Sequence, residues 1–214
     1  MNEQHRHDHQ DGVPHRHPLR PDQDDTLTYW RAMEIALREL LIEKQITNAD
    51  EVRRHVEEMD NRSPLQGARV VARAWSDPDY KRLLLEDGNA ACEELGLERG
   101  LFKLVAVENT EQVHNVVVCT LCSCYPRTLL GLPPDWYKSR NYRSRVINEP
   151  RDVLREFGTV IPDDVTVRVH DSTADMRYLI VPKRPAGTDG WTETQFADLV
   201  TRDAMIGVAL ARQP

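Results

Sequence analysis

Three of the four cysteines lie within six residues, in the segment Cys119-Thr120-Leu121-Cys122-Ser123-Cys124. A disulfide framework spreads its cysteines along the chain to close loops, whereas this sequence bunches them. In a reducing compartment, such bunching indicates metal binding or redox chemistry. The fourth cysteine, Cys92, stands alone in a helical pattern that ends at Gly96, and we expect it to be a small buried apolar residue.

Structural zinc is one interpretation of this cluster, and it would make the chain a non-catalytic, zinc-stabilised interaction subunit. Zinc in such sites has four ligands in a tetrahedron, commonly supplied as two separated cysteine pairs. A second pair is missing here. His114 is a conceivable fourth ligand, but a histidine inside a strand is more often a hydrogen-bonded polar residue. The zinc interpretation therefore stays open as an alternative.

The spacing Cys122-Ser123-Cys124 suggests a different metal. One residue between two thiolates brings the backbone nitrogens of Ser123 and Cys124 against the same ion, so that two nitrogens and two sulfurs form a plane. Cys119 can then occupy one axial position and leave the sixth position open. Amidate and thiolate are strong donors that suit a trivalent low-spin ion, and an open position on such an ion is a Lewis-acid site. We call residues 119–124 the cysteine claw.

The elements that must position this claw follow from hydrophobic periodicity and cap signals. Helices are predicted over 29–44, from near Thr47, over 65–75, over 80–86 after the Asp77-Pro78 start, around Cys92, over 142–147, over 151–157 and, from a capping box at Thr192, to Leu199. Strands are predicted over 101–107, 113–118, 166–169 and 177–181. The last strand is apolar enough to pair with the strand before it. The claw directly follows the strand 113–118.

These elements predict an α+β chain in which an N-terminal helical arm precedes a compact domain of short strands and helices that carries the claw. Residues 1–25 hold five of the eight histidines and little that could be buried, so we expect a disordered His-rich tail. Residues 26–96 form the expected helical arm. Residues 97–214 form the expected catalytic metal-binding domain.

Composition excludes several classes of function. The chain has 214 residues, of which 40% are hydrophobic and 29% charged, as is typical of a soluble globular protein. Its net charge of -7 disfavours nucleic-acid binding. No apolar run is long enough to span a membrane, and the polar N-terminus does not have the pattern of a signal peptide. We therefore expect a cytoplasmic protein with no nucleic-acid or membrane partner.

The claw and its flanks, Val118 to Pro126, resemble the metal-binding loop of the nitrile hydratase α subunit. The resemblance extends over roughly residues 27–209 and includes further segments: Ala68–Tyr80, Leu130–Tyr137, Arg184–Trp191, and Val200–Asp203 with Ile206–Val208. Thr120 resembles the cobalt form of the family, because the iron form usually has serine there. The resemblance thus implies one cobalt(III) per subunit, in preference to iron(III).

The family's site residues can be placed on this chain only through that resemblance. It implies that Cys119 is the axial thiolate, that Cys122 occurs as sulfinic acid and that Cys124 occurs as sulfenic acid. Ser123 and Cys124 would supply the amide nitrogens. The implied reaction is hydration of a nitrile to an amide, with Cys122, Ser123 and Cys124 as the catalytic residues. Either the Cys124 sulfenate or a nearby water or hydroxide would attack the nitrile carbon.

The resemblance also implies partners. In the family, a separate β-type subunit supplies arginines to the oxidised cysteines, so we expect a hetero-oligomer that is inactive without it, and a cobalt-loading activator protein. Thr120, Asp171, Arg177 and Tyr178 match positions that support the claw. The residues alone are equally consistent with an exposed ion pair of Asp171 and Arg177 at a hairpin.

Arg127 is the main departure from the family pattern, since most nitrile hydratases of this type have tryptophan there. An arginine beside the pocket would attract an anion, and the His-rich tail and Tyr125-Pro126-Arg127 resemble the γ subunit of thiocyanate hydrolase, which converts thiocyanate to carbonyl sulfide and ammonia. Residues 102–115 resemble the nitrile hydratase version more closely. Loss of tryptophan would also widen the pocket for a bulky heteroaromatic nitrile such as toyocamycin, so nitrile hydration is the favoured prediction.

Overall fold

The computed structural model describes residues 27–98 and 100–214, and the chain divides into residues 1–49 and 50–214. The first unit contains α1 (Tyr29–Glu43), which begins where the Thr28 hydroxyl accepts a hydrogen bond from the backbone nitrogen of Arg31. The predicted helix is confirmed, and none of its residues is buried. The predicted His-rich tail lies outside the described residues.

The second unit opens with helices whose ends follow the sequence signals. Asp77 caps α4, where it accepts hydrogen bonds from the backbone nitrogens of Asp79 and Tyr80. Asp87 caps the next helix in the same way. The early helices are α2 (Ala49–Asp60), α3 (Leu65–Ser76), α4 (Pro78–Glu86) and α5 (Gly88–Glu94). Both α4 and α5 pack on the first strand that follows them. The arm–domain boundary at 96/97 stays a prediction.

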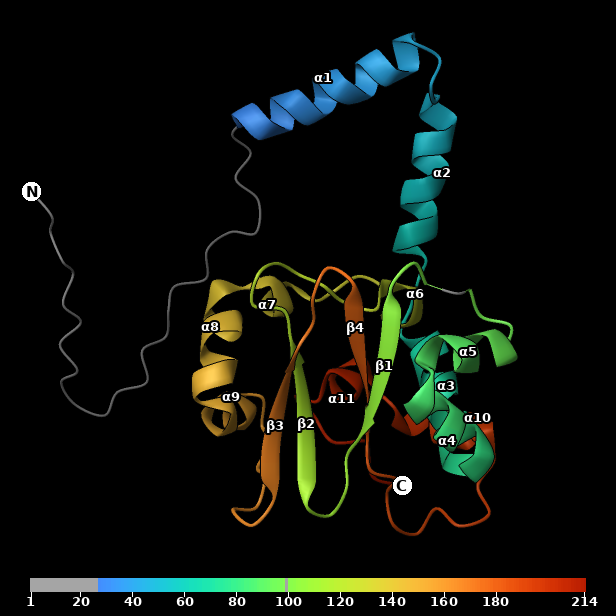
Figure 1. Ribbon diagram of the computed structural model, residues 1–214, viewed down its shortest axis with the longest axis vertical. Coiled ribbons are helices and arrows are strands. Elements are labelled where there is room, and N and C mark those ends of the chain that lie inside the picture. The colour runs from blue at the N-terminus through green and yellow to red at the C-terminus, as the bar shows by residue number, and fades with distance from the viewer. Residues whose placement is uncertain (1–26, 99) are drawn as a thin grey trace, which may run out of the picture. The chain divides into compact units, whose positions relative to one another are not determined.

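The four strands form two parallel pairs (Figure 1). They are β1 (Lys103–Glu108), β2 (Val113–Val118), β3 (Thr166–Asp171) and β4 (Met176–Val181). β1 pairs with β4, and β2 pairs with β3. The predicted pairing of β3 with β4 is therefore wrong. Parallel strands need a long crossover and are covered on both faces, which fits the complete burial of Leu179, Ile180 and Val181.

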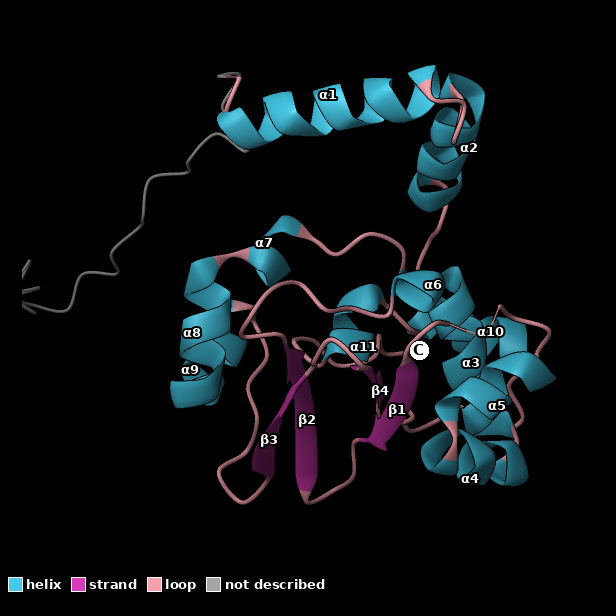
Figure 2. Cartoon of the chain, turned by 45° about the horizontal axis from the view of Figure 1, so that its top comes forward, coloured by secondary structure: helices cyan, strands magenta, loops and turns pink. Residues whose placement is uncertain are grey.

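Helices cover the strands (Figure 2). α8 and α9 lie beside β3, while α3, α4 and α5 lie on the side of β1. α11 contacts β2, β4 and α3. The remaining helices are α6 (Arg127–Leu130), α7 (Asp135–Lys138), α8 (Arg140–Asn148), α9 (Pro150–Glu156), α10 (Glu193–Leu199) and α11 (Arg202–Ile206). The capping box predicted at Thr192 is confirmed. No described helix has both the length and the apolar character needed to cross a bilayer.

Candidate metal centre

The claw follows β2 immediately and folds its three sulfurs together. The Sγ atoms of Cys119 and Cys122 lie 3.4 Å apart, and those of Cys122 and Cys124 lie 3.1 Å apart. All three sulfurs lie within 4.8 Å of one another. Cys119 and Cys124 are buried, whereas Cys122 is exposed. The prediction that these cysteines converge on one point is confirmed by the geometry.

Cys122 and Cys124 differ in acidity because their surroundings differ. Hydrogen bonds from Cys124 and Cys119 lower the pKa of Cys122 to about 7. Burial raises the pKa of Cys124 to about 12, and the nearby positive charge of Arg177 acts in the opposite direction. Burial also raises the pKa of Cys92, which lies outside the claw in α5, to about 11. Cys122 therefore has more thiolate character near neutral pH than Cys124 or Cys92.

The sulfur spacing fits a metal with ligands at right angles. Two sulfurs bound at right angles, each about 2.3 Å from one ion, would lie about 3.3 Å apart, whereas tetrahedral ligands would lie about 3.8 Å apart. The observed 3.1 and 3.4 Å are nearer the first value. Within residues 27–98 and 100–214, no histidine or carboxylate oxygen joins the three sulfurs. A tetrahedral zinc site would lack its fourth protein ligand there.

His114 is engaged elsewhere. Its Nε2 lies 2.7 Å from the carbonyl oxygen of Gly207, so Nε2 carries the proton and donates it. Its Nδ1 then accepts from the side-chain nitrogen of Asn109 at 3.3 Å. The ring is buried, and burial lowers the pKa of His114. His114 is thus a satisfied neutral core residue.

The claw is held at its first turn by a residue of β3. The carboxylate of Asp171 accepts hydrogen bonds from the backbone nitrogen of Thr120 at 2.9 Å and from its hydroxyl at 2.6 Å. At the other end of the claw, the Tyr137 hydroxyl donates to the carbonyl oxygen of Cys124 at 2.9 Å. The structure therefore brings the sequence-predicted Thr120 and Asp171 to the claw, and adds Tyr137.

Arg177 reaches the same region from β4. Its guanidinium lies 4.1 Å from the ring centroid of Phe102 and donates to the carbonyl oxygens of Thr173, Ala174 and Met176. It forms no ion pair with Asp171, and the two strands are not partners. The alternative of an ion pair at a hairpin is therefore wrong. Tyr178 stacks on His170, with ring centroids 5.0 Å apart, rather than on the cysteines.

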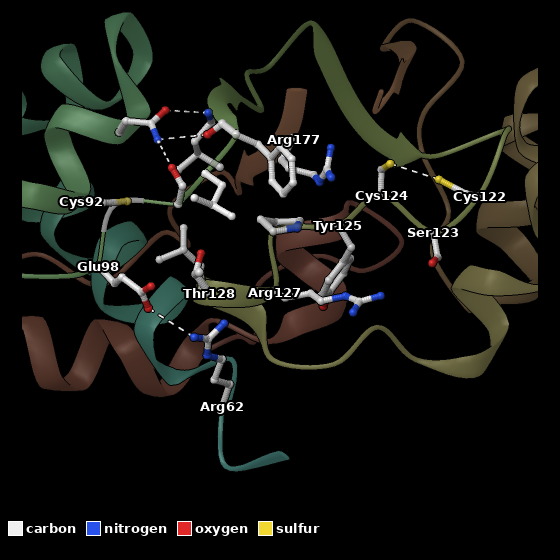
Figure 3. A pocket seen from close by; sticks show the side chains of 17 residues that line it. Arg62, Cys92, Glu98, Cys122, Ser123, Cys124, Tyr125, Arg127, Thr128 and Arg177 are labelled. Atoms are coloured by element: carbon white, nitrogen blue, oxygen red, sulfur yellow. Dashed lines mark hydrogen bonds and ion pairs between the residues drawn. The ribbon is translucent and has the colours of Figure 1, made fainter. Parts of the chain in front are cut away.

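A cavity of about 510 Å³ opens beside the claw (Figure 3). Cys122, Ser123 and Cys124 form one end of its wall, and Arg62 and Glu98, joined at 3.2 Å, lie at another part. Arg127, at the start of α6, also lines the cavity. Among the described residues, no hydrogen bond or ion pair engages the Arg127 guanidinium. The cavity thus combines sulfur ligands, an aromatic ring and cationic groups.

Sequence reasoning missed Arg143 and Tyr142, neighbours on α8. The Arg143 guanidinium donates to the carbonyl oxygens of Thr120 and Cys122, both at 3.3 Å. The Tyr142 hydroxyl donates to the carbonyl oxygen of Val117 at 2.7 Å. Arg143 sits in a stretch with Arg140 and Arg145, so residue type alone could not distinguish it. Only the position of α8 reveals the contact.

A family model described as the nitrile hydratase alpha chain matches residues 28–209. The chain belongs to the nitrile hydratase alpha-chain family. This confirms the resemblance inferred from the claw, and it confirms that the chain is an enzyme subunit.

Three relatives show the range of this family. The cobalt-containing nitrile hydratase subunit alpha of Pseudonocardia thermophila is 51% identical over 181 residues, which cover 83% of this chain and 88% of the relative. The thiocyanate hydrolase subunit gamma of Thiobacillus thioparus is 45% identical, covering 84% of this chain and 79% of that protein. A solved Fe-type nitrile hydratase variant from Comamonas testosteroni Ni1 matches with a TM-score of 0.79 and 40% identity, covering 86% of this chain and 91% of that one.

Proposed function

We propose that this chain is the metal-binding subunit of a nitrile hydratase that adds water to a nitrile to give the amide. The observation that carries the proposal is the meeting of three claw sulfurs, 3.1 and 3.4 Å apart, at the wall of a cavity of about 510 Å³. Family membership supports it.

The ligand set we propose is the sulfurs of Cys119, Cys122 and Cys124 with the backbone nitrogens of Ser123 and Cys124. Such strong donors suit a trivalent low-spin ion. Cobalt(III) is favoured by Thr120 and by the cobalt-containing relatives. The likeness to an Fe-type enzyme keeps iron(III) as the second candidate. Bound there, the ion supplies a Lewis acid that polarises the nitrile.

We further propose that Cys122 is oxidised to sulfinic acid and Cys124 to sulfenic acid. Cysteine oxidation follows thiolate character and exposure. Cys122 is exposed with a lowered pKa, whereas Cys124 is buried with a raised one. This difference supports the higher oxidation state at Cys122. The Cys124 oxygen, or a water beside it, is the nucleophile that attacks the nitrile carbon.

The chain's own residues shape the pocket in this proposal. Asp171 and Tyr137 hold the two ends of the claw, and Ser123 presents its backbone between the sulfurs. Phe102 lines the cavity, and the Arg177 guanidinium lies over its ring. A cavity of this size and an aromatic wall support a heteroaromatic nitrile, such as toyocamycin, as substrate.

Partners complete the proposed site. The hydrogen bonds to the claw sulfurs come from the claw itself, and arginines of a β-type subunit would supply charge-assisted bonds to the oxidised sulfurs. The exposed Cys122 and Leu121 support contact with such a subunit. Cobalt loading by an activator protein and a cytoplasmic location also belong to the proposal.

Thiocyanate hydrolysis is the second candidate, and one observation favours it. Arg127 lines the cavity, and its guanidinium has no hydrogen-bond or ion-pair partner among residues 27–98 and 100–214; such a group attracts an anion. A thiocyanate hydrolase gamma subunit is also 45% identical.

A competition assay separates the two activities. The complex, purified with its natural partner subunits from cobalt-fed cells, receives an aromatic nitrile and thiocyanate together, and amide and carbonyl sulfide are both quantified. Amide alone supports the proposal, whereas carbonyl sulfide alone overturns it in favour of the second candidate. Cys124→Ser should abolish turnover, and Cys92→Ser, at the cavity wall but outside the claw, should leave turnover nearly unchanged. A complex that holds zinc without added oxygen on Cys122 would return the chain to the interaction-subunit alternative.

A further inference from the structure

The Arg143 side chain contacts the backbone of the claw rather than the claw sulfurs. A single nitrogen, Nη1, donates to the carbonyl oxygens of Thr120 and Cys122, at 3.3 Å each. These carbonyls lie on either side of Leu121, so one donor bridges the turn that brings Cys122 back toward Cys119. Within that turn, the backbone nitrogen of Cys122 also donates to the sulfur of Cys119 at 3.3 Å.

The charge of Arg143 has no counter-charge in the described part of the chain. No salt bridge among the described residues involves Arg143, and the Arg143 Nε–H is buried without an acceptor from those residues. Arg143 as a whole is half-buried, and a polar N–H that is buried without an acceptor is costly unless something nearby offsets it. Arg145, in the last turn of α8, instead pairs with Glu149 at 2.5 Å and Glu156 at 2.6 Å. Arg143 therefore differs from its neighbour in facing the claw unpaired.

Its placement is rigid. The preceding residue, Tyr142, is buried, donates to the Val117 carbonyl of β2, and packs edge-on against Trp136 and Phe157. The Ser139 hydroxyl caps α8, and the Arg145–Glu156 pair ties α8 to α9. Since α8 is fixed to the strand that leads into the claw, the guanidinium is held in register with the turn.

Thr120 is thereby held from two sides. Asp171 of β3 accepts from its nitrogen and hydroxyl, while Arg143 of α8 donates to its carbonyl. The second carbonyl that Arg143 contacts, that of Cys122, shares a peptide unit with the nitrogen of Ser123. In the proposed ligand set that nitrogen is an anionic donor, and amide resonance spreads its charge onto this same oxygen.

We propose that Arg143 is a positioning residue of the metal centre: it closes the turn of the claw and offsets the negative charge of the Ser123 peptide unit. The inference rests on the proposed function for its metal and on this chain's contacts for its geometry. It predicts that Arg143 governs how much cobalt the claw retains and the electronic environment of that cobalt.

The test compares Arg143→Gln, Arg143→Lys and Arg140→Gln in the complex with its natural partners. Arg140 lies on the same helix, is exposed, and serves as the matched control. At limiting cobalt, Arg143→Gln should retain about tenfold less cobalt than wild type, as expected for loss of a residue that orients ligands. The visible absorption of the remaining cobalt should shift. Because one nitrogen makes both contacts, Arg143→Lys should recover most of the cobalt. Cobalt content and absorption equal to those of Arg140→Gln would overturn the proposal.

If wild type itself holds no cobalt, the proposed function fails. A second measurement then tests the positioning role of Arg143 without the metal. Hydrogen exchange at the backbone amides of residues 119–124 is measured in cobalt-free complexes. Faster exchange in Arg143→Gln, with Arg140→Gln like wild type, upholds the positioning role. Equal exchange in all three overturns it.

Discussion

Asp171 holds Thr120 through both the backbone nitrogen, at 2.9 Å, and the side-chain hydroxyl, at 2.6 Å. The parallel register explains the contact, because Val118 at the end of β2 lies opposite Asp171 at the end of β3. The first residue after the strand can then turn directly into the carboxylate. The entry to the claw is therefore set by a residue far along the chain.

Removal of that carboxylate should loosen the claw. Asp171→Ala leaves both Thr120 donors without their acceptor, and we expect cobalt retention and turnover to fall by about 10- to 100-fold. Thr120→Ser keeps both donors and should stay close to wild type, whereas Thr120→Val loses the hydroxyl and should fall between. Metal analysis of the purified complexes checks the order. An Asp171→Ala complex with full cobalt would contradict the assignment of this residue.

Thiol reactivity in the metal-free chain should follow the difference in acidity. Cys122 is exposed with a pKa lowered to about 7, whereas burial raises the pKa of Cys92 to about 11. Since only the thiolate is nucleophilic, iodoacetamide should modify Cys122 first, with a rate that rises through pH 7. Peptide mass spectrometry after brief treatment at pH 6, 7 and 8 reads this out. Earlier modification of Cys92 would contradict the lowered pKa of Cys122.

Gly207 is a position where a side chain cannot be added. Its φ is +93°, and a Cβ there would lie 2.1 Å from the carbonyl oxygen of Asn115. The left-handed conformation alone costs a non-glycine residue about 1–2 kcal/mol, and this clash is with backbone. Gly207→Ala should therefore destabilise the fold by more than Gly158→Ala, whose φ is +81° with open space around it. Chemical denaturation of the two variants measures the difference, and equal losses would contradict the clash.

His114 should make stability depend on pH. Burial lowers its pKa in the folded chain below the ordinary value of about 6.5. The unfolded chain therefore binds the proton more readily, so this contribution to the free energy of unfolding is complete above about pH 6.5 and is lost as pH falls toward the lowered value. His114→Gln should flatten this slope, while the exposed His55→Gln should not. Denaturation midpoints at pH 7.5 and 5.5 check it; an unchanged slope in His114→Gln would count against the account.

Most helices and strands could be predicted from the sequence because their signals are local. Each of three segments is specified by residues within it or at its start: α4 by Asp77-Pro78, α10 by the Thr192 capping box, and β3 by the polar–apolar alternation around Val167. Strand pairing was not predictable in the same way. The short connection between Asp171 and Met176 favours a hairpin, but partners are chosen by burial, and Val181 is wholly buried beside β1. That choice depends on the helices that cover the strands.

The same division applies to the metal centre. The cysteines and Ser123 were predictable because their spacing is itself the chemistry. Arg143 was not, because its function depends on where α8 docks rather than on its neighbours in sequence. Tyr178 shows the converse, since its match to the family predicted support of the claw, yet it stacks on His170; its role stays a prediction.

The bond between Thr120 and Asp171 spans 51 residues, and this has a consequence for the order of events during biosynthesis. The claw leaves the ribosome well before β3 does, so newly made cysteines spend an interval without their carboxylate clamp. Pairing between distant strands is also slow relative to local helix formation. Metal capture in the final geometry must therefore follow the synthesis of β3, and oxidation of the thiols in that interval would compete with it.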